Sequence, residues 1–160
     1  MAEHVILVSI GEPFAASVSE ERLELIARRV LEAEGVGAAE LSVTVTDDET
    51  VRSLNRRYAG EDAVTDVLSF SQREGEEFPA PPGGVPALGE VIIAYPQALR
   101  QALRQGSGRA VESVEAEVAR LLIHGILHLL GYDHAEPEEE RRMRAREEEL
   151  LEATGSRKSL

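Results

Sequence analysis

The sequence predicts one compact domain in which short β-strands alternate with α-helices. The chain has 160 residues, of which 42% are hydrophobic and 29% are charged, a composition typical of a single globular domain. Apolar residues alternate with polar ones in some segments and recur every three or four positions in others, which are the periods of strands and helices. No internal repeat divides the chain, so we expect residues 1–160 to form a single domain.

Capping and turn residues delimit the predicted elements. Ser19 is a suitable N-cap and Gly35 a suitable stop for the first helix, and Asp47 or Asp48 can cap the second. Pro137 suits the first position of the last helix. In order, the elements are a strand at His4–Ile10, a helix between Ser19 and Gly35, a strand at Leu41–Val45, a short helix after Asp48, strands at Val67–Phe70 and Glu90–Ala94, and helices after Tyr95, at Ala110–Leu130 and from Pro137.

Two segments have distinct predicted environments. The short helix after Asp48 turns one side inward and an arginine side outward; its inward residues are Val51, Leu54 and Tyr58, and its outward ones Arg52, Arg56 and Arg57. The Ala110–Leu130 helix begins amphipathic and is expected to end buried on every side. The proline-rich stretch Ser71–Leu88 is expected to be a surface loop.

Charge limits the classes of partner. The net charge is −13, from 17 basic and 30 acidic residues, which argues against a protein that coats nucleic acid through a broad basic face, and we expect no DNA partner. The segment Val91–Val111 differs, because it has no acidic residue and carries Arg100, Arg104 and Arg109. A local site for an anion therefore remains compatible with the sequence.

The absence of cysteine, of a signal peptide and of a membrane span indicates where the protein is located in the cell. Cysteine is absent, so neither disulfides nor thiolate metal sites can form. The first ten residues have no basic segment and no cleavage site of a signal peptide. The apolar run Leu121–Leu130 is too short to cross a bilayer. We therefore expect a soluble, cytoplasmic protein with no membrane partner.

Three of the four histidines predict a metal site. His124 and His128 are four residues apart on the predicted long helix, so they project side by side, separated by a rotation of about 40° and a rise of about 6 Å. Gly131 can end the helix in a left-handed conformation and bring His134 to the same point. Three imidazoles around Zn²⁺ leave a fourth position open, as in catalytic zinc sites. The sequence therefore predicts one zinc ion per chain.

The histidines could instead be hydrogen-bonded core residues, or part of a protease motif. A single histidine in an apolar helix is more often a hydrogen-bonded core residue, and His4 is interpreted in this way. Three histidines within eleven residues favour a metal, because paired imidazoles in an apolar environment would otherwise leave polar atoms unsatisfied. The spacing also matches the metzincin protease motif, but the position of the proteolytic glutamate is Gly125. A peptide hydrolase is thereby disfavoured.

The histidine segment resembles the signature of a known family. Residues 124–134 read H-G-I-L-H-L-L-G-Y-D-H, which is similar to the H-G-x-L-H-L-x-G-Y-D-H motif of the YbeY family of bacterial metal-dependent endoribonucleases. Further matches occur in the family's order, over about residues 41–151: Leu54-Asn55 with Tyr58, Thr65 to Phe70, Gly89 to Ile92, and Met143 followed by Glu147-Glu148.

This resemblance implies both a fold and an activity. The implied fold is α+β, with a small mixed β-sheet packed against several helices and the metal site at the end of a buried central helix. The implied activity is that of a zinc-dependent endoribonuclease, specific for single-stranded RNA, in 16S rRNA 3′-end maturation and ribosome quality control. The implied partners are rRNA and the small ribosomal subunit.

The chain departs from the family at one functional position. Family members place an arginine after the tyrosine of the L-N segment, and this position is Ala59 in the present sequence. Arg57 is the nearest substitute as a substrate-binding residue, with Arg100 and Arg104 as further candidate cations. Each of these arginines also fits a solvated helix face.

The remaining roles at the predicted site are less defined. Asp66 and Asp133 can orient ligands of the metal, or can serve as turn or cap residues. The sequence identifies no general base. Two rival functions therefore stay open: a ribosome-associated assembly factor with a structural zinc, and a metal-dependent hydrolase of another bond, such as a peptide.

Overall fold

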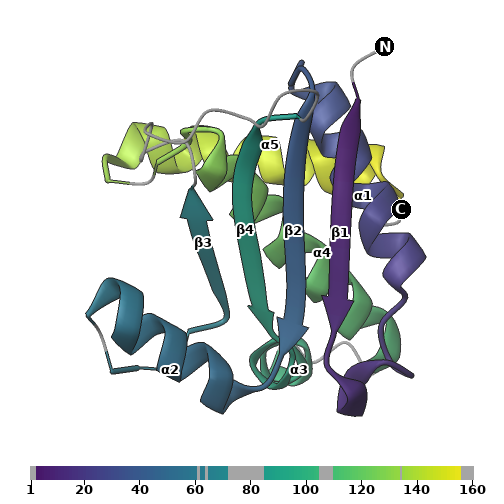
Figure 1. The fold of residues 1–160 in the computed structure, drawn as a ribbon, viewed down its shortest axis with the longest axis vertical. Helices are drawn as coiled ribbons and strands as arrows, with labels where there is room; N and C mark the ends of the chain where they lie inside the picture. The colour runs from purple at the N-terminus through teal and green to yellow at the C-terminus, as the bar shows by residue number, and fades with distance from the viewer. Residues whose placement is uncertain are drawn as a thin grey trace.

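A four-stranded mixed β-sheet forms the centre of the protein (Figure 1). The structure is a computed structural model that describes residues 3–60, 62–63, 65–71, 85–104, 110–133 and 135–155. The strands β1 (His4–Ile10), β2 (Ala39–Thr46), β3 (Val67–Ser71) and β4 (Ala87–Ala94) lie in the order β1-β2-β4-β3. β1, β2 and β4 are parallel, and β3 pairs antiparallel with β4. The predicted mixed sheet is thus confirmed.

Helices cover one face of this sheet (Figure 1). α4 (Ala110–Leu129) lies at the centre of this layer and contacts β3, β4, α1 (Glu20–Ala33), α3 (Tyr95–Arg104) and α5 (Pro137–Ala153). The core between the sheet and α4 includes Val91 and Ile93 of β4 and Ile123 and Ile126 of α4. This arrangement is the expected α+β fold with a buried central helix.

α2 (Asp48–Ala59) packs against the opposite face of the sheet. Its Val51 is fully buried against Ile92 and Ala94, which alternate along β4 with the residues that face α4. Phe70 and Leu68 of β3 complete this smaller cluster. β3 and β4 therefore separate α2 from α4.

Capping explains where these helices begin and end. The Ser19 side chain accepts the Arg22 backbone N–H at the start of α1, and the Asp47 side chain accepts that of Thr50 at the start of α2. Of the two aspartates proposed for α2, Asp47 is thus the N-cap. Gly35 and Gly60, which follow α1 and α2, have φ angles of 68° and 74°, in the left-handed region that favours glycine.

The structure corrects several expectations from the sequence. The helical pattern predicts that Tyr58 points inward, but Tyr58 is 63% exposed because α2 ends at the margin of the sheet. The end of α4 is not buried on every side, since His124 and His128 are only half-buried. The predicted loop Ser71–Leu88 is shorter at both ends, because β3 includes Ser71 and β4 begins at Ala87. Residues 72–84 of that loop lie outside the described residues.

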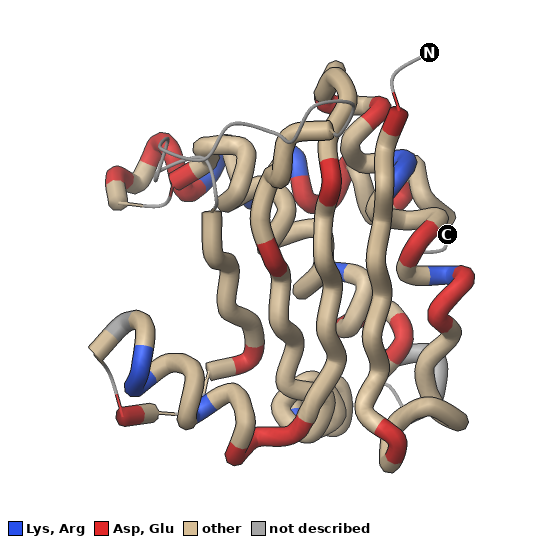
Figure 2. The backbone as a smooth tube through the Cα atoms, in the orientation of Figure 1, with Lys and Arg blue, Asp and Glu red and all other residues tan. Residues whose placement is uncertain are grey.

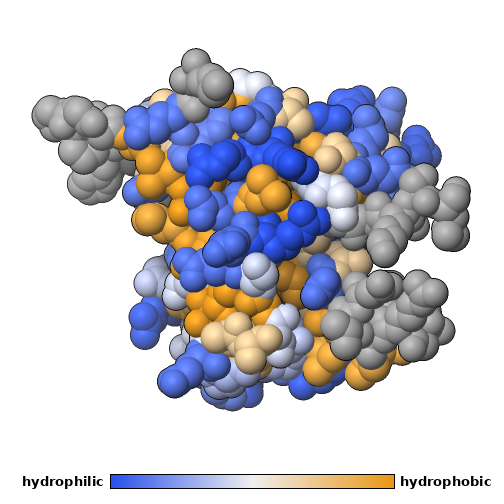
Figure 3. Space-filling model, turned by 90° about the vertical axis from the view of Figure 1, so that its right-hand side faces the viewer, coloured by the Kyte–Doolittle hydropathy of each residue, from blue (hydrophilic) through white to orange (hydrophobic). Residues whose placement is uncertain are grey.

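Charge and hydropathy vary over the surface. Basic residues occur along α2, whereas acidic residues are spread over many elements (Figure 2). On the side formed by β1 and α1, apolar patches are interrupted by hydrophilic residues (Figure 3). Exposed Leu7 and Leu25 belong to these two elements. Among the described helices, none is both long and apolar enough to cross a membrane.

Candidate metal centre

His124 and His128 lie side by side on α4, as their spacing predicts. Their ring centroids are 5.1 Å apart and the rings meet edge to face at 74°. The His124 side chain is 26% exposed. Two imidazoles at this separation, open on one side, can contribute nitrogen ligands to one ion.

A buried carboxylate orients the first histidine. His124 Nδ1 lies 2.5 Å from Glu147 Oε1, a carboxylate of α5 that is only 7% exposed. With the Nδ1 proton donated to this carboxylate, Nε2 is the nitrogen left with a lone pair for a metal. Metal-binding histidines in proteins usually donate their second ring N–H to a carboxylate, carbonyl or water in this way. The residues present therefore fit a metal ion such as zinc.

Gly125, between the two histidines, sets the distance between α4 and the sheet. A Cβ atom at this position would lie 2.6 Å from Val91 Cγ1 and 3.1 Å from Ser69 Oγ. The Ser69 hydroxyl donates a hydrogen bond of 3.1 Å to the Gly125 carbonyl. Position 125 thus faces β3 and β4 rather than the histidines, and a glutamate there would collide with the sheet.

A separate polar network lies one turn before His124 on α4. Arg120, one turn before His124, donates to the buried carboxylate of Glu117 at 2.5 Å and to Gln101 at 3.4 Å. Gln101 in turn donates to Asp66 at 3.0 Å. The hydrogen bond to Glu117 raises the pKa of Arg120, with smaller contributions from Glu147 and Asp66. Arg120 is thus paired with one carboxylate, Glu117, and linked to Asp66 through Gln101.

The segment that follows α4 is held by a second network. Gly131 has a φ angle of 101°, so the predicted left-handed stop is present. Tyr132 donates a hydrogen bond of 2.7 Å to Glu34, and Arg146 donates two to the same carboxylate, of 3.0 and 2.8 Å. Desolvation and the bond to Glu34 raise the pKa of Tyr132. α1, α5 and this segment are thereby joined through one carboxylate.

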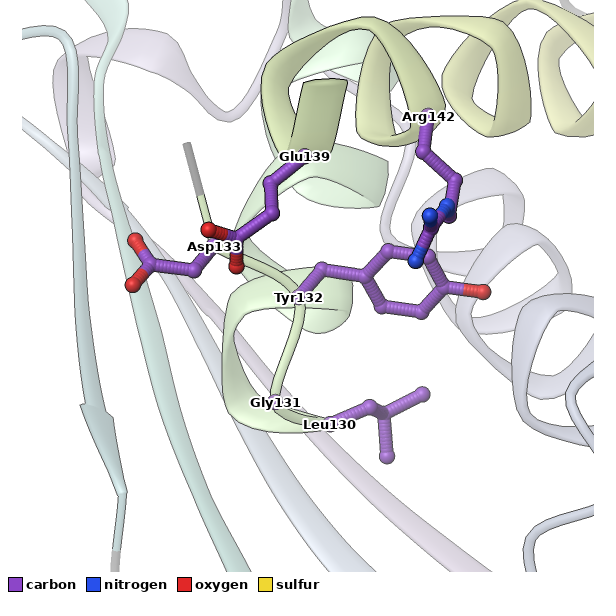
Figure 4. A pocket seen from close by; sticks show the side chains of 6 residues that line it. All are labelled: Leu130, Gly131, Tyr132, Asp133, Glu139 and Arg142. Atoms are coloured by element: carbon purple, nitrogen blue, oxygen red, sulfur yellow. The ribbon is translucent and has the colours of Figure 1, made fainter. Parts of the chain in front are cut away.

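A cavity of about 340 Å³ opens beside this segment (Figure 4). Arg142 stands next to the Tyr132 ring in this view, and the carboxylates of Asp133 and Glu139 extend to the other side. The lining residues are Leu130, Gly131, Tyr132, Asp133, Glu139 and Arg142. The cavity adjoins the end of α4 and is lined by both acidic and basic side chains.

The predicted third ligand, His134, lies outside the described residues. Within the described ranges, no three His, Asp or Glu side chains converge to hold an ion. His124 and His128 would therefore need a further ligand. His4 is a core residue as expected, because it is buried and its Nε2 lies 2.9 Å from the Val36 carbonyl oxygen.

The other candidate residues lie in different places. Arg57 is exposed on α2, with its guanidinium carbon 5.9 Å from the centre of the Tyr58 ring. Arg100 pairs with Asp48 at 2.9 Å, and the side chain of Arg104 is outside the described part. Asp66, one of the two aspartates predicted either to orient ligands or to serve as turn or cap residues, accepts a hydrogen bond from Gln101. The other, Asp133, lines the cavity.

Sequence reasoning assigned no role to Glu147, although a signal was present. Met143, Glu147, Leu150 and Leu151 recur at helical spacing and are the buried residues of α5. A glutamate within an otherwise apolar stripe must have a partner, because an isolated buried carboxylate is costly. That reasoning would have identified Glu147 as a functional candidate, but not its partner.

These features define an α+β domain with a candidate metal centre on its central helix. The family model described as Endoribonuclease YbeY matches residues 12–155. The chain belongs to this family.

Individual relatives agree with the family match. Endoribonuclease YbeY of Roseiflexus castenholzii is 40% identical over 156 residues, covering 96% of this chain and 95% of the relative. That of Moorella thermoacetica is 46% identical over 149 residues, covering 88% and 92%. The solution structure of TM1509 from Thermotoga maritima has a similar fold, with a TM-score of 0.55 and 22% identity over 97% of each chain.

Proposed function

We propose that this protein is a zinc-dependent endoribonuclease that cleaves single-stranded RNA during 16S rRNA 3′-end maturation and ribosome quality control in the cytoplasm. The observation that carries the metal dependence is the orientation of His124 by Glu147 beside His128. The relatives named Endoribonuclease YbeY support the activity. The assignment to rRNA and the small ribosomal subunit rests on the resemblance of residues 124–134 to the family signature.

His124, His128 and His134 would hold the ion. When bound, zinc supplies a Lewis acid that stabilises negative charge on a phosphoryl oxygen. Glu147 keeps the proton on His124 Nδ1 and fixes the ring. The Ser69 bond to the Gly125 carbonyl holds the histidine-bearing turn against the sheet. These residues therefore prepare the site before RNA binds.

One alternative retains support. Ala59 stands where the family has an arginine, and the net charge of −13 disfavours tight binding to RNA. Both observations favour an assembly factor whose zinc is structural. Peptide hydrolysis through a glutamate at position 125 has no support, because that position faces Val91.

Zinc content and RNA cleavage test the proposal together. We expect about one zinc ion per purified chain, and cleavage of a single-stranded RNA that stops when zinc is removed and returns when it is restored. His128→Ala should lose both zinc and cleavage, whereas His4→Gln should keep both, provided it is folded. Cleavage of RNA by the zinc-free protein would contradict a catalytic zinc. If the zinc-free protein unfolds and the zinc-loaded protein does not cleave RNA, the structural alternative is favoured.

A further inference from the structure

The end of α2 presents an aromatic ring to solvent. Tyr58 is 63% exposed, although tyrosine usually covers much of its ring in a folded domain. On one side the Tyr58 ring packs edge to face against the Phe70 ring. The two ring planes meet at 64° and the centroids are 5.5 Å apart. Phe70 itself packs in the cluster between α2 and the sheet. The Tyr58 ring is therefore held in place while much of its surface stays accessible.

A cation accompanies this ring. The Arg57 guanidinium carbon lies 5.9 Å from the Tyr58 centroid. Among the described residues, no carboxylate forms an ion pair with Arg57, whereas Arg52 on the same helix pairs with Asp62 at 2.7 Å. An exposed aromatic ring and a guanidinium that pairs with no carboxylate of the described residues match the two parts of a nucleotide, its base and its phosphate.

The ring is connected to the histidines across a single strand. Phe70, which holds Tyr58, is next in β3 to Ser69, whose hydroxyl bonds the carbonyl of Gly125 beside His124. β3 is the last strand of the sheet, with no described strand beyond it. A single strand of RNA that passed round the edge of β3 would contact both the histidines and Tyr58.

We propose that Tyr58 is a base-stacking residue for single-stranded RNA, with Arg57 contacting an adjacent phosphate. This inference rests on the proposed function, because it adds a nucleotide subsite to that reaction. It also gives Arg57 a role that does not require it to replace the arginine missing at Ala59. Stacking on an aromatic ring is tolerant of base identity, so the subsite selects unpaired bases rather than a sequence.

Binding of a cleavage-resistant single-stranded phosphorothioate RNA, followed by fluorescence anisotropy, tests the proposal. Tyr58→Ala should raise Kd about 5- to 150-fold, which corresponds to the ~1–3 kcal/mol of one base stack. Tyr58→Phe and Tyr58→Trp keep a ring and should bind about as tightly as wild type. Leu103→Ala, which truncates a side chain 58% exposed on α3, is the matched control and should not change Kd.

A duplex of the same length supplies a second readout, because its bases cannot reach the ring. Tyr58→Ala should weaken binding of the single strand much more than binding of the duplex. A Tyr58→Ala protein with wild-type circular dichroism and unchanged Kd would overturn the inference, as would Tyr58→Phe binding as weakly as Tyr58→Ala. Wild-type protein that neither binds nor cleaves RNA would instead overturn the proposed function.

Discussion

Glu147 indicates which ring nitrogen of His124 is available to a metal ion. The histidine spacing predicts a pair of ligands but cannot say which ring nitrogen faces the ion. The contact of Glu147 with Nδ1 decides this, and it depends on how α5 crosses α4. A packing angle between helices is a tertiary property, which explains why the histidines could be proposed as ligands from the sequence whereas the contact of Glu147 with His124 could not.

Replacing this carboxylate should weaken metal binding. Glu147→Gln retains the shape of the side chain but loses the charge that favours a proton on Nδ1. We expect zinc affinity to fall about 10- to 100-fold, the usual effect of removing such a partner. Competition with a chelator measures this affinity. Glu152→Gln, at an exposed position of the same helix, should leave it unchanged; equal affinities for the two variants would contradict the role of Glu147.

Gly125 provides a second test at the scale of a residue. Gly125→Ala gains up to about 1 kcal/mol of helix propensity, but its Cβ would lie 2.6 Å from Val91 in the rigid sheet. Overpacking of this kind costs about 1–3 kcal/mol, so the free energy of unfolding should fall. Gly37→Ala is the control, because nothing lies within 4 Å of its Cβ position. Denaturant unfolding compares the two, and a stabilised Gly125→Ala would refute the packing argument.

At the scale of elements, the start of α2 was predicted correctly, but the exposure of Tyr58 was not. Asp47 and Gly60 mark its ends through local hydrogen bonds and backbone conformation, which a sequence encodes directly. Whether Tyr58 is covered depends instead on where the sheet ends beside it. The periodicity that placed Tyr58 with Val51 and Leu54 was therefore right about the side of the helix and wrong about burial.

The cap of α2 should make its stability depend on pH. The Thr50 backbone N–H lowers the pKa of Asp47 below its ordinary value of 3.8. Because the folded pKa is the lower one, the contribution of the carboxylate is present above pH 3.8 and is lost as pH falls through the folded value. Asp47→Ala should cost about 1 kcal/mol at neutral pH.

Asp47→Asn separates the cap from its charge, since asparagine caps helices about as well. We expect the free energy of unfolding of Asp47→Asn to be close to that of wild type at neutral pH. The difference in this free energy between wild type and Asp47→Ala should become smaller in acid. Denaturant unfolding at several pH values measures both differences. A difference in free energy of unfolding that increases as pH falls would contradict a lowered pKa of Asp47 in the folded protein.

At the scale of the whole molecule, the fold class was predictable from alternating strand and helix patterns together with the family resemblance. The strand order was not, because the pairing of β4 between β2 and β3 joins segments far apart in the chain. The placement of α2 and α4 on opposite faces follows from that order. The subsite at Tyr58 therefore emerges only from the assembled sheet.

Net charge leads to a further expectation for RNA binding. With a net charge of −13, the protein must bind RNA through a few local contacts rather than through a general positive field. For single-stranded nucleic acid, each phosphate contact adds about −0.7 to the slope of log affinity against log salt concentration. Arg57→Gln should reduce the slope by about 0.7, whereas removing an arginine already paired with a carboxylate, as in Arg52→Gln, should change it less. Equal slopes for wild type and Arg57→Gln would contradict a phosphate contact by Arg57.

The contact between His124 and Glu147 has a consequence for how the protein is made. The two residues are 23 positions apart, and the carboxylate belongs to α5, the last helix of the described residues. During translation, both helical histidines leave the ribosome before Glu147, the carboxylate that orients His124. A nascent chain that ends before Pro137 contains the pair without its partner. High-affinity binding of the proposed ion is therefore expected to wait until α5 has been synthesised and has docked on α4.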